Sequence, residues 1–151
     1  MDIKIVKADS QYTEDCKIAL VNSELGRVYF SDPLGAINEG ISKKEIYVAL
    51  SSDDKCVGFM WVIMNGAFHS YPYLHVIAVK EELRNRGIGK KLMDYFEKVI
   101  SKGYSKVFLV VADFNSKAKK LYEALGYKQV GIIPNLYKSG VTEFLMMKVL
   151  L

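Results

Sequence analysis

A short glycine-containing stretch, residues 84–89, has the composition of an anion-binding loop. It reads Arg84-Asn85-Arg86-Gly87-Ile88-Gly89 and lies between an apolar run at 74–79 and an amphipathic run at 90–102. These flanks predict a strand before the loop and a helix after it, with a buried apolar stripe at 88, 92, 96, 99 and 100. Glycine lets a ligand approach the backbone closely, and the first turn of a helix offers unpaired N–H groups at the positive end of the helix dipole. The stretch therefore favours a phosphate or pyrophosphate ligand.

Two common phosphate-binding motifs are disfavoured at single positions of this stretch. A P-loop needs a glycine where Arg84 stands and a serine or threonine where Lys91 stands. A dinucleotide-binding fingerprint needs a third glycine at the position of Leu92. A nucleoside triphosphatase and a dinucleotide-binding protein are thus both disfavoured, whereas a plain tight turn at a helix start stays open on the glycines alone.

The elements that must position this loop follow from hydrophobic periodicity and turn residues, which predict an α/β layered domain with a mixed sheet. Helix-linked strands are expected to be parallel and hairpin-linked strands antiparallel. In chain order we expect a strand around Ile3 and Ile5; a helix capped by Asp9 or Ser10 and ended by Gly26; at most a short, irregular helix in 27–45; a hairpin of 46–50 and 57–64; a turn at Asn65-Gly66; a strand at 74–79; a helix at 90–102 ended by Gly103; a central strand at 107–112; a helix from Asn115 or Ser116 to Gly126; and strands at 127–133 and 144–149.

Length, charge and cysteine usage limit the classes of protein to which the chain can belong. The 151 residues predict a single domain, 1–151, and the net charge of +4 comes from scattered Lys and Arg residues, so no nucleic-acid partner is expected. The apolar runs fall short of the ~20 residues of a membrane helix, and the charged N-terminal strand does not read as a signal peptide. Cys16 and Cys56 lack metal-binding or CxxC spacing, which predicts reduced, partly buried thiols, no metal and a cytoplasmic protein.

A second stretch contains Asn115, Ala118, Leu121, Tyr122, Leu125, Gly126 and Tyr127. With this stretch and the glycine loop together, the chain resembles the GNAT superfamily of acetyl-CoA-dependent N-acetyltransferases. Arg84, Gly87 and Gly89 fill the defined positions of its loop signature, between a strand and a helix. The second stretch is similar to the family's "N…A…LYEKLGF" helix, and both motifs lie at the family's mutual distance. The resemblance implies the GNAT fold: a mixed, mostly antiparallel central sheet flanked by helices, with splayed fourth and fifth strands.

The same resemblance implies that acetyl-CoA is the acetyl donor and a substrate, with no metal involved. Its pyrophosphate would rest on the backbone amides of the glycine loop, and its pantetheine arm would pair with the main chain of the fourth strand. Asn115 matches a position that often contacts the donor, although helix capping is an alternative role. The implied donor-binding residues are Ile77, Ala78, Val79, Arg84, Asn85, Arg86, Gly87, Ile88, Gly89, Lys90, Asn115 and Tyr122.

For catalysis, Tyr122 matches the position of the general acid in the GNAT superfamily. Without this resemblance, the alternative interpretation is that Tyr122 is a core tyrosine. The family's glutamate on the fourth strand is replaced by Tyr73, so the general base departs from the pattern. His75 faces the same side of the strand as Tyr73, and an imidazole titrates near neutral pH, so His75 is the predicted base; a packed sheet histidine is the alternative. His69 is a further candidate. Glu24, Glu39 and Glu143 are candidates for binding a cationic acceptor, unless they are simply solvated.

The predicted function is therefore acetyl transfer from acetyl-CoA to a primary amine of a small molecule or peptide by direct attack. Both cysteines lie outside the two motifs, which disfavours a covalent acetyl-cysteine intermediate. The alternative is a non-catalytic module that binds or senses acyl-CoA. The acceptor pocket is expected in 24–45, 65–73 and 134–143, with the aromatic segment 68–73 in its wall, and open sheet edges would allow a homodimer.

Overall fold

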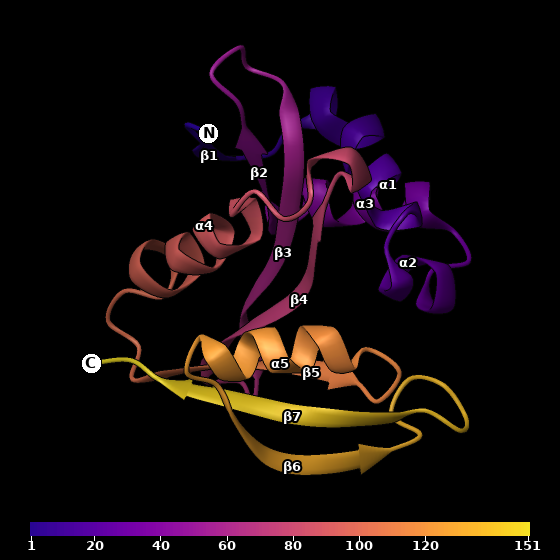
Figure 1. The fold of residues 1–151 in the computed structure, drawn as a ribbon, viewed down its shortest axis with the longest axis vertical. Coiled ribbons are helices and arrows are strands. Elements are labelled where there is room, and N and C mark those ends of the chain that lie inside the picture. Colours follow the sequence, from indigo (N-terminus) through magenta and orange to yellow (C-terminus); the bar gives the residue numbers. More distant parts are fainter. The chain divides into compact units, whose positions relative to one another are not determined.

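A seven-stranded sheet with the strand order β1-β2-β3-β4-β5-β7-β6 runs through the computed structural model, which describes residues 1–151. The β1–β2, β2–β3, β5–β7 and β6–β7 pairs are antiparallel, and the β4–β5 pair is parallel. The predicted mixed, mostly antiparallel sheet flanked by helices is therefore confirmed (Figure 1). The chain divides into two compact units, one formed by 1–62 and 76–100 and the other by 63–75 and 101–151.

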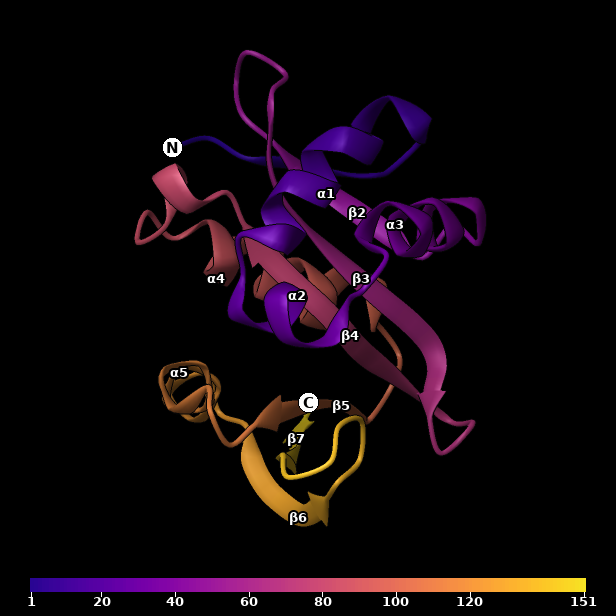
Figure 2. The same ribbon diagram turned by 90° about the vertical axis from the view of Figure 1, so that its right-hand side faces the viewer.

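The first unit carries the glycine loop on a frame of strands and short helices. Its strands are β1 (Lys4–Lys7), β2 (Ile46–Leu50) and most of β3 (Cys56–Ala67) with the end of β4 (Tyr71–Val79). Its helices are α1 (Thr13–Val21), α2 (Glu24–Tyr29), α3 (Pro33–Ser42) and α4 (Ile88–Tyr95), with the 3-10 turns Ser10–Tyr12 and Glu81–Leu83 (Figure 2). Fully buried side chains on these elements, with Phe96 directly after α4, form its core: Leu20, Ile37, Ile46, Val48, Phe59, Met60, Leu92 and Phe96.

The second unit places α5 on one face of its strands and leaves polar side chains on the other. It contains β5 (Lys106–Ala112), α5 (Ser116–Ala124), β6 (Lys128–Pro134), β7 (Thr142–Val149) and the start of β4. The Lys119 ammonium of α5 lies 4.3 Å from the Phe144 ring centroid, which puts α5 on the Phe144 face. Paired residues share a face and successive residues alternate. Glu143 precedes Phe144, so its side chain points away from α5, as does that of its partner Ala112. Phe108 lies four residues before Ala112 on β5 and points the same way, and Tyr73 pairs with Phe108. The Tyr73 and Glu143 side chains therefore share the face opposite α5.

The predicted end of the first helix at Gly26 is wrong. The helix ends at Val21, and Gly26 lies inside the separate helix α2, whose first turn is capped by the Ser23 hydroxyl accepting from the Gly26 amide at 2.9 Å. A Cβ at Gly26 would lie 1.8 Å from the Leu20 carbonyl oxygen. The glycine therefore permits two short helices to pack closely rather than ending one long helix.

Region 27–45 also differs from the expectation of a short, irregular helix. It contains α3, ten residues long, with Pro33 at its start and Asp32 accepting a hydrogen bond from the Gly35 amide as the N-cap. Proline at the first helical position with an aspartate cap is a favourable helix start, so Pro33 begins the helix instead of breaking it. Gly40 gives α3 close contact with the sheet, since its Cβ would come within 2.9 Å of the Trp61 ring.

The predicted turn at Asn65-Gly66 is likewise wrong, because both residues lie within β3. The chain instead turns at 68–70, where Phe68 and His69 both have φ of 56°. A Cβ at Gly66 would lie 2.8 Å from the Tyr73 Cβ, so the glycine serves close approach of the two hairpin strands.

The helix after the glycine loop begins at Ile88 and changes form before its end. After Tyr95 the chain continues as a π-helical turn, Phe96–Ile100. The wider turn rotates later residues away from the α-helical stripe, and Val99, an expected core position, is 54% exposed. The expected stop at Gly103 is confirmed by its φ of 92°. No helix of the chain combines the length and apolar character needed to cross a membrane.

Candidate active site

The glycine loop leaves open space at the start of α4. Gly87 is the N-cap residue with φ of 82°, and no side chain caps the helix. A Cβ at Gly87 would meet no atom within 4 Å, and one at Gly89 would meet only the Val79 Cγ2, at 4.0 Å. Neither glycine is therefore required by packing inside the first unit. Uncapped N–H groups beside open space suit a phosphate-bearing ligand, so these residues fit the expected pyrophosphate.

Arg84 holds the loop rather than projecting freely from it. Its guanidinium donates to the Asn22 carbonyl oxygen at 2.8 Å and to the Val79 carbonyl oxygen at 3.3 Å. The arginine thus ties the end of α1 to the end of β4. Arg86 and Lys90 lie exposed on either side of Gly87, and they add positive charge around the open helix start.

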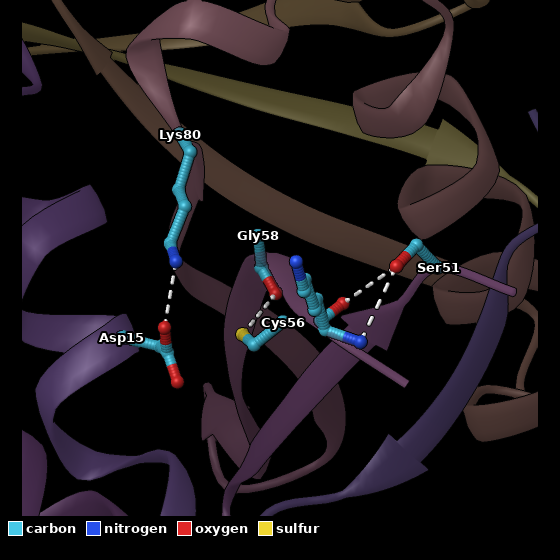
Figure 3. Close-up of polar contacts among 6 residues, drawn as sticks. Asp15, Ser51, Cys56, Gly58 and Lys80 are labelled. Atoms are coloured by element: carbon cyan, nitrogen blue, oxygen red, sulfur yellow. Dashed lines mark hydrogen bonds and ion pairs between the residues drawn. The ribbon is translucent and has the colours of Figure 1, made fainter. Parts of the chain in front are cut away.

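The residue that joins β4 to the loop is also anchored twice. The Lys80 ammonium lies 2.6 Å from an Asp15 carboxylate oxygen on α1 (Figure 3). The Lys80 amide donates to the Val57 carbonyl oxygen at 2.9 Å. The two side chains are 18% and 36% exposed, so the ion pair is partly shielded from water. This anchor, together with Arg84, fixes the chain on the approach to the glycines.

The end of β4 presents alternating buried and half-buried residues. Ala78 is buried, whereas Ile77 and Val79 are half-buried. The Ala78 carbonyl oxygen would lie 2.9 Å from a Cβ at Gly58, so β3 passes unusually close to β4 at this point. The predicted donor-binding residues 77–79 and 84–90 therefore all lie in the first unit, separated only by residues 80–83 and held by common anchors.

In the second unit, Tyr122 lies on α5 with its ring 6.0 Å from that of Tyr127, centroid to centroid. Part of its side chain reaches the surface, but burial raises the Tyr122 pKa to about 12. The phenol is therefore protonated at neutral pH, as a proton or hydrogen-bond donor must be. Asn115 stands at the N-cap position of α5 but makes no side-chain cap hydrogen bond, so the structure does not bear out the capping alternative.

A polar cluster lies on the opposite face of the second unit. The Tyr73 and Tyr137 hydroxyl groups form a hydrogen bond of 3.0 Å. Burial raises the Tyr73 pKa above its usual range, and the Tyr137 hydroxyl and the Glu143 carboxylate add to the effect. Glu143 itself is 1% exposed. His75 is half-buried beside Tyr73, with 6.3 Å between ring centroids, as the strand alternation predicted.

A family comparison gives this geometry its context. Residues 14–127 match the model of the "Acetyltransferase (GNAT) family". The chain belongs to this family. The GNAT match covers most of the chain and runs through both compact units, including the glycine loop and Tyr122.

Relatives and a solved structure agree with the GNAT assignment. The chain is 38% identical to an N-alpha-acetyltransferase of Sulfurisphaera tokodaii over 72 residues, which are 46% of this chain and 43% of that protein. It is 46% identical to a thialysine N-epsilon-acetyltransferase of Bos taurus over 55 residues, 36% of this chain and 32% of that protein. The chain thus aligns with less than half the length of these relatives. An aminoglycoside 6'-N-acetyltransferase complexed with coenzyme A shares the fold, with a TM-score of 0.77, 21% identity and coverage of 100% of this chain and 98% of that one.

Not every expected GNAT site residue lies where the sequence suggested. His69 is exposed in a turn, and Glu39 forms an exposed ion pair with Lys43 at 2.7 Å. Glu24 lies exposed at the start of α2 and is a surface residue as well. Glu143 instead is buried. Tyr137, which sequence reasoning did not single out, belongs to the polar cluster, and its only sequence signal was its position in the 134–143 segment expected to line the acceptor pocket.

Proposed function

We propose that this GNAT protein transfers an acetyl group from acetyl-CoA to a primary amine by direct attack of the amine on the thioester. The observation that carries the proposal is the open, uncapped start of α4 at Gly87 and Gly89, in a chain of the acetyltransferase family. We propose further that residues 1–151 act as one N-acetyltransferase domain, which the span of the family match through both units supports.

The proposed donor site consists of the loop and of the strand that leads into it. Backbone amides at 87–90 would hold the pyrophosphate of acetyl-CoA, and Arg86 and Lys90 would add charge. The main chain of 77–79 would pair with the pantetheine arm, and Asn115 would contact the donor. The coenzyme A complex of the structurally similar aminoglycoside 6'-N-acetyltransferase supports this choice of donor.

The acceptor must lose a proton before or during attack. An alkyl ammonium with a pKa near ~10 is neutral about one time in a thousand at pH 7, an uphill step of roughly 4 kcal/mol. We propose that the His75 imidazole takes this proton, directly or through water, since its half-buried ring lies on the polar face of β4 beside Tyr73. The nitrogen lone pair then forms the C–N bond as the C–S bond breaks.

Tyr122 would assist departure of the CoA thiolate. Its pKa of about 12 lies above the ~8.5 of a thiol, so complete proton transfer to the thiolate is unfavourable in the unliganded protein. We therefore propose that the phenol donates a hydrogen bond to the developing negative charge on sulfur, with protonation completed from solvent. A hydrogen bond that strengthens as charge develops stabilises the transition state more than the ground state.

The polar cluster of the second unit favours an acceptor that carries positive charge. Glu143 is buried, its carboxylate influences Tyr73, and Tyr137 is half-exposed above them. A buried carboxylate beside hydroxyl groups attracts an ammonium group. The relatives' names include an α-amine and a side-chain ε-amine as acceptors, so small-molecule and peptide amines both remain in the proposed class.

The test is release of CoA thiol from acetyl-CoA across a panel of small-molecule and peptide amines. The proposal expects amine-dependent thiol release with at least one cationic primary amine. Tight CoA binding without turnover on any amine would instead favour the non-catalytic acyl-CoA module.

Two wider predictions accompany the proposal. Buried free thiols at Cys16 and Cys56 favour a reducing compartment, and hence a cytoplasmic location.

The edge strand β6 exposes the side chains of Val130 and Ile132, which are 50% and 61% exposed, and such an edge favours a homodimer. Sedimentation analysis distinguishes the dimer from the monomer.

A further inference from the structure

The loop that carries Tyr137, residues 135–141, is closed by hydrogen bonds at its base. It connects the end of β6 to the start of β7 and lies wholly in the second unit. The Asn135 amide donates to the Val141 carbonyl oxygen at 3.0 Å, and the Gly140 amide donates to the Asn135 side-chain oxygen at 2.7 Å. The two ends of the loop are therefore tied together through the backbone and through the Asn135 side chain.

The residue types at these two ends suit a closed loop. Asn135 has φ of 57° and Gly140 has φ of 82°, so both adopt the left-handed backbone conformation. Glycine and asparagine enter this region at a lower cost than most other residues. The Asn135 side chain thus closes the loop from a backbone conformation that asparagine tolerates.

A second pair of hydrogen bonds fixes the end of this loop to β5. The Asp113 amide, directly after β5, donates to the Thr142 carbonyl oxygen at 2.9 Å. In return, the Thr142 amide donates to an Asp113 carboxylate oxygen at 3.1 Å. The next pair along the two strands is Ala112 with Glu143, and Glu143 is buried. The loop is therefore anchored directly beside the buried carboxylate of the polar cluster.

The side chain of Tyr137 depends on this anchored loop for its position. It is 52% exposed, yet its hydroxyl group lies 3.0 Å from the Tyr73 hydroxyl group. A half-exposed side chain loses conformational entropy when it is held in one place. A closed loop lowers that cost, because it fixes the backbone from which the phenol ring projects. Opening the loop should therefore weaken the bond between the two phenols.

We propose that Asn135 and Asp113 are positioning residues for recognition of the acceptor amine. Their side chains keep loop 135–141 closed, and the closed loop holds the Tyr137 phenol against Tyr73. Neither side chain acts on the acceptor itself. Loss of either side-chain bond should raise the KM for the amine about fivefold, the effect of one lost neutral hydrogen bond. This kinetic consequence rests on the proposed function, whereas the placement of Tyr137 does not.

Two pairs of matched variants separate the side-chain bonds from the backbone of the loop. Asn135→Gly removes the side-chain oxygen and tolerates the left-handed conformation, whereas Asn135→Asp keeps an oxygen that can accept from the Gly140 amide. In the same way, Asp113→Ala removes the acceptor of the Thr142 amide, and Asp113→Asn keeps one. Hydrogen exchange should become faster at the Gly140 amide in Asn135→Gly and at the Thr142 amide in Asp113→Ala, which verifies that each bond is lost in folded protein.

The position of Tyr137 is read from the NMR signal of Tyr73 in protein with ¹³C at the tyrosine Cζ. Tyr73→Phe identifies this signal, and Tyr137→Phe shows where it lies without its partner. In Asn135→Gly and Asp113→Ala the Tyr73 signal should move toward its position in Tyr137→Phe. In the two conservative variants it should stay near the wild-type position. Faster amide exchange with an unmoved Tyr73 signal would overturn the positioning role of the residue that was replaced.

Kinetics then test whether Asn135 acts through Tyr137. Asn135→Gly should raise the KM for the amine about fivefold and leave the KM for acetyl-CoA constant, and Asn135→Asp should restore the amine KM. In a Tyr137→Phe background the same replacement should add little, because the bond that it supports is already gone. An equal rise in both backgrounds would contradict the proposal. If wild-type protein acetylates no amine, the proposed function fails, and the Tyr73 signal still decides the placement of Tyr137.

Discussion

The Tyr73 hydroxyl lies 3.0 Å from the Tyr137 hydroxyl, and this bond joins β4 to the segment between β6 and β7. Both residues lie in the second unit, close enough to the buried Glu143 for its carboxylate to raise the Tyr73 pKa. The bond thus closes a polar cluster on the face opposite α5, and its removal tests whether that cluster binds the acceptor.

Replacement of either phenol should weaken acceptor binding more than donor binding. Tyr73→Phe and Tyr137→Phe each remove one neutral hydrogen bond, worth about 1 kcal/mol, so Tm should fall by about 2 to 4 °C. The KM for the amine should rise severalfold while the KM for acetyl-CoA stays constant. Tyr104→Phe, which alters a tyrosine outside the cluster, is the control. Equal effects of all three variants on the amine KM would exclude an acceptor role for the cluster.

Gly89→Ala should separate ligand binding from folding. A Cβ at Gly89 meets only the Val79 methyl group at 4.0 Å, so the fold accommodates it, and alanine favours a helix by about 0.5 to 1 kcal/mol. Tm should therefore stay constant or rise by about 2 °C, while CoA binding weakens because the Cβ occupies the approach to the backbone amides. Calorimetric titration with CoA measures this, with Gly131→Ala as a control in the second unit. Undiminished CoA affinity in Gly89→Ala would remove the loop from the donor site.

Gly26→Ala should destabilise the fold strongly. The new Cβ would lie 1.8 Å from the Leu20 carbonyl oxygen, and backbone must move to relieve the clash. A loss of about 3 kcal/mol or more in the free energy of unfolding is expected from urea denaturation. At Gly131 the nearest atom to an added Cβ is 3.5 Å away, so Gly131→Ala should unfold almost as the wild type does.

The sequence predicted most elements because their signals are local. The apolar stripe at 88, 92, 96, 99 and 100 and the glycine stops at 103 and 126 depend on residues within one helix. Both stops and the burial of positions 88, 92 and 96 are confirmed, whereas Val99 is exposed. Gly26, Asn65 and Gly66 were misread because glycine is common in turns, whereas here distant atoms decide its role: the Leu20 carbonyl group and the Tyr73 side chain.

The candidate site likewise contains residues that a local sequence signal identifies and contacts that only the folded chain reveals. The glycine loop and Tyr122 belong to contiguous motifs and could be found in the sequence. The Arg84 bond to Asn22 and the burial of Glu143 depend on how distant segments fold together, so no local pattern reports them.

Alkaline pH should destabilise the wild type through Tyr122. Its folded pKa, about 12, lies above the unfolded value of ~10, so the neutral phenol's stabilisation is complete below pH ~10 and is lost as pH rises toward 12. Between pH 9 and pH 11 this contribution should cost about 1 kcal/mol. Urea unfolding of Tyr122→Phe at both pH values should show a correspondingly smaller loss, and identical losses in the two proteins would contradict the assigned burial of the phenol.

The most direct test of the central claim is to identify both products of the reaction, with mass spectrometry for the acetylated amine and a thiol assay for free CoA. Wild-type protein with acetyl-CoA and a cationic primary amine should form the two products in equal amounts. Tyr122→Phe should form them about a hundredfold more slowly while binding CoA as tightly. Bound CoA with no acetylated product from any amine of the panel would contradict the proposed N-acetyltransferase activity.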